Sequence, residues 1–313
     1  MSDFAEDVRR GLTSTPKRLS SKYFYDATGD ELFCAIMACK EYYLTNCEME
    51  IFTTQSDAIL DVALNGSPTI DVVELGPGDA SKSVHLLRAV ARRASDVSYY
   101  PVDISSNIIE SLERTLPESV PGLSVRGKAG DFVDMVHNIT DVSDRPKLVL
   151  FLGSTIGNLT IAESTAFFSA LRSNMRKADM LLVGFDLQKR PKTILAAYDD
   201  AQGVTSRFNQ NLLTRMNREL GATFDTSKFE HYPLYDPELG TCKSFLVSCE
   251  EQSVRIEALD LDVHFAANEC IHTEVSQKYT REQIEHFATA GGFESVKMFT
   301  DSKGWFVDAL YIV

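Results

Sequence analysis

The chain has 313 residues, of which 44% are hydrophobic and 24% charged, and its formal net charge is −14. At roughly 150 residues per domain this length leaves room for two domains, and the composition is too apolar for a disordered chain. The acidic balance would repel the phosphates of a nucleic acid, and no apolar run approaches the roughly 20 residues of a membrane span. We therefore expect a folded protein that binds neither nucleic acid nor a membrane.

The sequence carries no signal for export or for metal binding. Residues 1–24 mix charged and polar side chains, without the apolar core of a secretory signal, so we expect a cytoplasmic protein. The six cysteines form no CxxC pair, and the six histidines show no HxH or HExxH spacing. Those are the commonest spacings of a zinc site, so no metal is expected. Nothing in the sequence indicates an obligate protein partner.

From residue 69, short apolar runs alternate with longer amphipathic stretches, which is the pattern of a parallel sheet built from βα units. Clear strands are predicted at 69–76, 97–105, 147–159 and 178–187, and a weaker strand at 123–132. After residue 187, a long polar helical segment precedes three alternating segments that are typical of antiparallel strands. A helix ended by Gly291 and Gly292 and two further strands close the chain.

The fold class predicted from this order is α/β, with a Rossmann-like, doubly wound sheet interrupted by an inserted α+β domain. We assign residues 52–187 and 279–313 to the doubly wound domain, because the final helix and strand pair can return to the first sheet. Residues 1–51 and 188–278 form the second domain. Open α/β sheets bind ligands at the carboxyl ends of their strands, so the candidate residues are sought there.

Glycines and acids stand at those strand ends. Residues 74–79 (ELGPGD) follow the first strand and precede a helix, so a ligand can approach both the backbone and the helix N-terminus. Asp103 ends the second strand, in the position of the acid that binds an adenosine ribose. Asp131 and Phe132 end the weaker strand and suit an adenine amino group and its ring. The expected cofactor-binding residues are Glu74, Gly76, Gly78, Lys82, Asp103, Asp131 and Phe132.

The glycine turn separates two classes of cofactor. A dinucleotide site usually carries a third glycine in GxGxxG, and Ser81 stands in that position here, which disfavours an oxidoreductase. An acid followed by two spaced glycines, with another acid after the second strand, resembles the pattern of class I methyltransferases. That resemblance implies S-adenosylmethionine as the cofactor, and Lys82 is expected to reach its carboxylate.

A more specific resemblance rests on longer strings along the chain. They are YFYD (23–26), EYYLT (41–45), FLGSTIGN (151–158), YDD (198–200), GVT (203–205), FN (208–209), NREL (217–220) and TEVS (273–276). Together they resemble the histidine-specific Nα-methyltransferases of ergothioneine biosynthesis, from about Arg10 to the C-terminus. The resemblance implies a class I methyltransferase domain with an inserted substrate-binding domain. It also implies trimethylation of the α-amino group of L-histidine to hercynine, with S-adenosylmethionine as methyl donor.

Carried over position by position, the resemblance assigns a clamp for the substrate carboxylate to Tyr42, Asn158 and Tyr198. It places Tyr25 and Gly153 near the amino group. Neutral phenols and an amide bind a carboxylate without placing a full positive charge beside the cofactor's sulfonium. The catalytic residues expected are Tyr25 and Asn158. No dedicated general base is identified, and we expect the amine to lose its proton through Tyr25 or a bound water.

The imidazole end of the substrate is assigned to Glu274 and Ser276, which stand two apart in an extended segment and so share one face. A carboxylate for the ring N–H and a hydroxyl for the other nitrogen would select histidine. Ser244 stands where bacterial histidine enzymes carry a methionine against the imidazole. A different acceptor, such as an aromatic amino acid, therefore stays open, although Glu274 buried against a phenyl ring would lack a partner.

A catalytically silent protein that senses the cofactor or histidine is the alternative outside enzymes. Loss of the clamp tyrosines would distinguish it, and Tyr25, Tyr42 and Tyr198 are all present. The leading hypothesis is an S-adenosylmethionine-dependent amino-acid N-methyltransferase with a small-molecule substrate.

Overall fold

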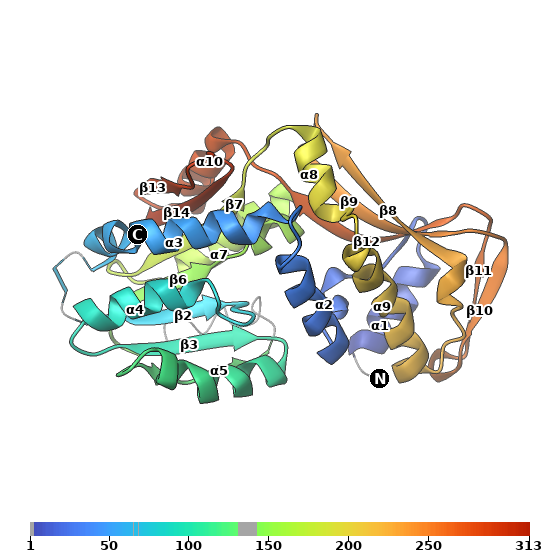
Figure 1. The fold of residues 1–313 in the computed structure, drawn as a ribbon, viewed down its shortest axis with the longest axis horizontal. Coiled ribbons are helices and arrows are strands. Elements are labelled where there is room, and N and C mark those ends of the chain that lie inside the picture. Colours follow the sequence, from blue (N-terminus) through green and yellow to red (C-terminus); the bar gives the residue numbers. More distant parts are fainter. Residues whose placement is uncertain (1–2, 65, 68, 131–142) are drawn as a thin grey trace. The chain divides into compact units, whose positions relative to one another are not determined.

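The computed structural model divides into two compact units (Figure 1). Unit 1 comprises Met1–Tyr43 and Lys189–Ser276, and unit 2 comprises Leu44–Gln188 and Gln277–Val313. The structure describes residues 3–64, 66–67, 69–130 and 143–313. Within those ranges no helix combines the length and the apolar character needed to cross a bilayer.

Unit 2 begins earlier than residue 52, where the sequence analysis places the first boundary. The reason is α3 (Tyr43–Ala63), which runs unbroken through that point. Gln55 of this helix donates from Nε2 to the carbonyl oxygen of Thr300 at 2.8 Å. From Leu44 onward the helix therefore belongs to unit 2.

Unit 2 contains a mixed sheet in the order β13-β14-β7-β6-β2-β3-β4, with β5 also paired to β3. Its strands are β2 (Asp71–Leu75), β3 (Ser98–Asp103), β4 (Ser124–Val125), β5 (Lys128–Ala129), β6 (Lys147–Phe151), β7 (Met180–Asp186), β13 (Ser295–Thr300) and β14 (Phe306–Ile312). The pairs from β4 to β7 are parallel, whereas β14 is antiparallel to both β7 and β13. From β4 to β7 this is the 3-2-1-4-5 order of a doubly wound sheet, so the predicted α/β class is confirmed.

Two predicted strands are shorter than the sequence pattern indicates. The run predicted at 147–159 stops at Phe151, because Gly153 and Ser154 adopt φ of +70° and +58° and turn the chain into a 3-10 helix. The weaker segment at 123–132 forms β4 and β5, which have two residues each. Gly127 lies between them, and a glycine offers no side chain to pack against the sheet.

Helices cover both faces of this sheet. α7 (Ile161–Ser173) and α10 (Arg281–Gly291) pack on the face that carries Phe185, and each begins with a threonine capping box. Gly184 precedes Phe185 in β7 and therefore belongs to the opposite face. A Cβ at Gly184 would collide with the carboxylate of Glu48, so α3 lies on that opposite face. The remaining helices of this part are α4 (Ser83–Arg93), α5 (Ser106–Ser119) and the 3-10 helix Thr155–Asn158.

Unit 1 contains a sheet in the order β1-β12-β9-β8 and a separate hairpin, β10-β11. Its strands are β1 (Lys17–Arg18), β8 (Phe229–Asp236), β9 (Thr241–Ser248), β10 (Gln252–Ile256), β11 (Leu261–Phe265) and β12 (Cys270–Gln277). Its helices are α1 (Asp3–Thr13), α2 (Ala27–Met37), α8 (Pro191–Tyr198), α9 (Val204–Leu220) and the 3-10 helices Ser21–Phe24, Thr226–Lys228 and Glu257–Leu259. The three alternating segments predicted after residue 187 correspond to β8, β9 and the hairpin.

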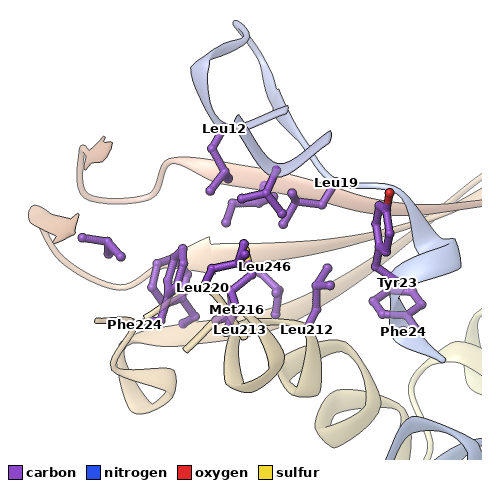
Figure 2. Packing of buried hydrophobic residues seen from close by; sticks show 14 of the residues in the cluster. Leu12, Leu19, Tyr23, Phe24, Leu212, Leu213, Met216, Leu220, Phe224 and Leu246 are labelled. Atoms are coloured by element: carbon purple, nitrogen blue, oxygen red, sulfur yellow. The ribbon is translucent and has the colours of Figure 1, made fainter. Parts of the chain in front are cut away.

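Figure 2 shows how the core of unit 1 forms. Leu212, Met216 and Leu220 recur every four residues along α9, so they share one face of the helix. That face lies against the sheet at Leu246 of β9. Leu12 of α1 joins the same cluster, so the N-terminal segment and the insertion share one hydrophobic core.

Candidate active site

The predicted glycine turn of unit 2 has the geometry of a ligand cradle. Gly76 and Gly78 adopt φ of +71° and +55°, a conformation that favours glycine. A Cβ at either position would have no heavy atom of the described residues within 4 Å, so both Cα atoms border space that those residues leave open. The turn is held to the neighbouring strand, because Gly76 N donates to the carbonyl oxygen of Val102 at 2.8 Å. The described residues therefore leave room for a ligand to approach this backbone closely.

Asp103, the last residue of β3, borders the same turn. Its Oδ2 accepts a hydrogen bond from Gly78 N at 3.3 Å, and its Oδ1 accepts one from Ser105 N at 2.9 Å. Partial burial raises the pKa of this carboxyl, and the backbone N–H donors counteract that effect. Each oxygen keeps a further lone pair for a ligand hydroxyl. The other acid and ring predicted here, Asp131 and Phe132, lie outside the described residues.

Glu74 directs its side chain into the protein. It is 2% exposed, and Tyr99 donates from its hydroxyl to Glu74 Oε2 at 2.6 Å. Burial raises the pKa of Glu74 to about 7, although the hydrogen bonds from Tyr99 and Ser83 oppose that rise. The carboxyl thus joins β2 to β3 and α4, and its contact with a cofactor stays a prediction.

Lys82, which is predicted to bind the cofactor, lies close to Gly153, which is predicted to bind the acceptor. Its ammonium forms an ion pair with Glu48 of α3. The same nitrogen lies 3.1 Å from the position that a Cβ at Gly153 would occupy. Unit 2 therefore brings a predicted cofactor-binding residue next to a predicted acceptor-binding residue, through a glutamate that the sequence analysis missed.

The turn after β6 is fixed from several sides. Gly153 N donates to Glu48 Oε1 at 2.7 Å, and Ser154 Oγ accepts a hydrogen bond from Asp186 N at 3.2 Å. Ser154 keeps a positive φ, which costs about 1–3 kcal/mol outside glycine, so these bonds maintain a strained conformation. Asn158 ends the following 3-10 helix and is partly exposed.

Unit 1 brings together the residues predicted for the imidazole. Ser244 of β9 donates from Oγ to Glu274 Oε2 of β12 at 3.1 Å. On the same strand, Ser276 Oγ accepts a hydrogen bond from the hydroxyl of Tyr198 at 2.7 Å. Two hydrogen-bonded pairs therefore lie along β12: Glu274 with Ser244, and Ser276 with Tyr198. We call these four side chains the polar row.

A second layer of hydrogen bonds supports this row. Thr273 Oγ1 donates to Asn209 Oδ1 of α9 at 2.8 Å, and both residues are buried. His272 Nε2 lies 2.9 Å from the carbonyl oxygen of Glu274. Asn209 and Thr273 belong to the strings that carry the family resemblance, and in the structure they hold β12 against α9.

Tyr25 and Tyr42 lie around one phenylalanine. The ring of Phe33 lies 5.6 Å from Tyr25 and 6.3 Å from Tyr42, both edge to face. Phe208 of α9 lies 5.7 Å from Tyr25. The faces of such rings favour a nearby cation, including a methylated ammonium. Phe33 and Phe208 had no assigned role, and their place among apolar helix residues gives no local signal for one.

The turn that presents Tyr25 is held by Asp26, the N-cap of α2. Asp26 accepts hydrogen bonds from Gly29 N, Asn211 Nδ2 and Arg218 at 2.8, 2.8 and 2.6 Å. Burial opposes its ionisation, but these donors hold the pKa of Asp26 below its ordinary value. Within the described ranges, no group of three or more His, Cys, Asp or Glu side chains is placed to hold a metal ion.

Comparison with known proteins identifies the family of this chain over nearly its whole length. A family model for histidine-specific, S-adenosylmethionine-dependent methyltransferases matches residues 4–312. The chain is 40% identical over 300 residues to the histidine N-alpha-methyltransferase of Mycolicibacterium smegmatis, covering 96% of this chain and 92% of that one. It is 27% identical over 288 residues to ergothioneine biosynthesis protein 1 of Schizosaccharomyces pombe, covering 90% of this chain and 37% of that protein. It is also 27% identical over 317 residues to a 4-dimethylallyltryptophan N-methyltransferase of Penicillium roqueforti, with coverage of 97% and 90%.

Proposed function

The chain belongs to the histidine-specific, S-adenosylmethionine-dependent methyltransferases, and from that membership we propose that it methylates the α-amino group of L-histidine. The acceptor carries three methyl groups at the end of the reaction, which gives hercynine, the product expected for the ergothioneine pathway. The observation that carries the choice of acceptor is the polar row on β12, where Glu274 and Ser276 share one face.

The polar row fits an imidazole better than it fits an indole or a phenyl ring. A neutral imidazole presents one N–H donor and one acceptor nitrogen, whereas an indole presents a donor only and a phenyl ring presents neither. Glu274 accepts from the N–H, and the hydroxyl of Ser276 serves the other nitrogen. An acceptor that leaves either group unpaired in a buried site loses about 1–3 kcal/mol of binding for each one.

Ser244 bears on the second candidate acceptor, a tryptophan derivative of the kind named for the Penicillium relative. A small residue at this position can leave room for a larger ring. In this structure, however, Ser244 Oγ donates to Glu274 and is 1% exposed, so it orients the carboxylate. That hydrogen bond supports histidine.

The residues of unit 2 fit the methyl donor. Bound S-adenosylmethionine supplies a methyl group on a positively charged sulfur. Gly76 and Gly78 leave open space along the backbone, and Asp103 keeps lone pairs for the ribose hydroxyls. An acid is suited to hydroxyl groups, and no phosphate has to be accommodated, which agrees with the missing third glycine.

The acceptor residues hold the amino acid without a competing cation. The phenol of Tyr42 and the amide of Asn158 are neutral donors for the carboxylate, and Tyr198 joins them when its hydroxyl turns from Ser276 to the substrate. The amine must lose a proton before each transfer, because an ammonium has no lone pair to attack the methyl carbon. We assign the proton to Tyr25 or to a water beside it. Positioning supplies most of the rate, since an in-line displacement needs little covalent help.

We place the reaction in the cytoplasm. Cys249 and Cys270 are exposed and take part in no disulfide bond. Exposed free thiols are typical of a reducing compartment.

Product analysis tests the proposal. The protein is incubated with S-adenosylmethionine and each of the twenty amino acids in turn, and with 4-dimethylallyltryptophan. We expect mass spectrometry to show one, two and three added methyl groups on histidine, with fragments that place them on the α-nitrogen. Methylation of the imidazole ring, faster methylation of the tryptophan derivative, or no methylated product would each overturn it.

A further inference from the structure

A group of buried ionisable side chains lies on the face of the unit 2 sheet that α3 covers. Glu48, Glu74 and Asp308 are at most 2% exposed, and Lys82 is the cation that influences all three. One ammonium can neutralise one carboxylate, so the remaining acids must be stabilised in another way. The contacts of each carboxyl show which one carries the charge.

Glu48 has the contacts of an ionised carboxylate. Its Oε2 forms the ion pair with Lys82, and its Oε1 accepts the hydrogen bond from Gly153 N at 2.7 Å. The space for this carboxylate is provided by Gly184, where any Cβ would collide with Glu48 Oε1. The sequence therefore leaves a gap in β7 that the glutamate fills.

Asp308 has the contacts of a neutral carboxyl. It stands opposite Gly184 in the register of β14 and β7, so it lies beside the Glu48 carboxylate. No N–H or O–H donor of the described residues reaches either of its oxygens. Burial and the charge of Glu48 raise the pKa of Asp308 well above its ordinary value, and Lys82 opposes that rise. A protonated Asp308 can donate to Glu48, which no ionised Asp308 could do.

We propose that Glu48 is a positioning residue for methyl transfer, whose carboxylate links the Lys82 ammonium to the Gly153 N–H while Asp308 donates a hydrogen bond to it. The proposal rests on the proposed function, since Lys82 is expected to bind the donor and Gly153 the acceptor amine. Through Glu48, the donor-binding lysine and the acceptor-binding turn are held in one arrangement. If Glu48 loses its charge, neither Lys82 nor the turn at Gly153 is held in place.

Three glutamine and asparagine variants separate this role from general stability. Glu48→Gln keeps the shape of the side chain but presents an amide to Lys82. Asp308→Asn keeps a donor toward Glu48 and removes only the acid. Glu50→Gln is the matched control, because Glu50 lies on the same helix and bonds Ser302 at 2.8 Å.

We expect kcat/KM for histidine to fall at least about tenfold in Glu48→Gln, much less in Asp308→Asn, and not at all in Glu50→Gln. Because Lys82 is released, the affinity for S-adenosylhomocysteine, measured by calorimetry, falls in Glu48→Gln together with the activity. Circular dichroism and thermal melting establish that each variant is folded. A larger loss in Asp308→Asn than in Glu48→Gln, or equal losses in both, would overturn the proposal.

Infrared spectroscopy gives a readout that needs no activity. At a pH of about 8.5, above the pKa of Glu74, the folded protein should show the band of a protonated buried carboxyl. The band should disappear in Asp308→Asn and persist in Glu50→Gln. Its absence from the unmodified protein would overturn the assignment of the proton. If histidine is not the acceptor, the band and the calorimetry still decide the role of Glu48.

Discussion

The two units present different chemistry at the residues assigned to ligand binding. Unit 2 places ionisable groups beneath glycine turns, where Glu48, Lys82 and Asp103 bond the backbone or one another. Unit 1 offers hydroxyls and aromatic rings, with Glu274 as the acid of its polar row. Buried charge fixes the geometry of a backbone turn, whereas neutral donors recognise a zwitterion without binding a competing ion. The following predictions test that contrast in order of expected size.

The largest effect concerns the buried acid of unit 2 and the stability of the fold. The pKa of Glu74 is about 7 against an ordinary 4.5, so its contribution is fully present below about pH 4.5 and is lost as pH rises through about 7. A shift of that size corresponds to about 3 kcal/mol. Glu74→Gln removes this pH dependence. Between pH 5 and 9, the free energy of unfolding of the variant should therefore rise relative to that of the unmodified protein by up to that amount.

Denaturant unfolding at several pH values measures that gain. Glu163→Gln in the exposed capping box of α7 is a control, because its carboxyl lies at the surface. A difference between Glu74→Gln and the unmodified protein that does not change with pH would show that Glu74 is ionised throughout.

The polar row of unit 1 predicts the largest effect on activity. Glu274→Ala removes the acceptor for the imidazole N–H and leaves Ser244 without its partner. We expect kcat/KM for histidine to fall about a hundredfold, because the imidazole N–H loses a charged hydrogen-bond partner. Steady-state kinetics with varied histidine measures the loss. A change of less than threefold would remove Glu274 from the site.

A smaller effect is expected at Tyr42, one of the neutral donors assigned to the substrate carboxylate. Tyr42→Phe keeps the ring against Phe33 and removes only the hydroxyl. The KM for histidine should rise about tenfold, with a much smaller change in kcat, since a donor to the carboxylate is lost from the ground state and the transition state alike. An unchanged KM would contradict the clamp assignment.

The smallest effect is expected at Ser244. Ser244→Ala removes one hydrogen bond to Glu274 but leaves the carboxylate in place. The KM for histidine should rise about threefold, and the relative rate with 4-dimethylallyltryptophan should stay low. A switch of preference toward the tryptophan derivative would assign Ser244 to pocket size instead of carboxylate orientation.

The sequence predicts the fold of unit 2 well because its central strands carry local signals. β6 and β7 are buried on both faces and read as nearly continuous apolar runs. The pattern predicts less where the backbone departs from such runs, as after Phe151 or between β4 and β5. The first domain boundary was likewise hidden, since nothing in the periodicity shows which unit α3 accompanies.

The candidate site divides in the same way. The turn at Gly76 and Gly78 is a local motif, whereas the residues of unit 1 were assigned from a resemblance, because its polar row joins α8, β9 and β12. Glu48 was missed because its partner Gly153 lies 105 residues away in sequence. Asp308 did leave a signal, since an acid inside an apolar strand is buried only with a partner.

Calorimetric titration with S-adenosylhomocysteine tests the division between the two units most directly. The titration compares the unmodified protein with Asp103→Ala and with Glu274→Ala. We predict that Asp103→Ala loses at least about tenfold in affinity, because the ribose loses its acceptor, while Glu274→Ala binds as tightly as the unmodified protein. Similar losses in both variants would contradict the account.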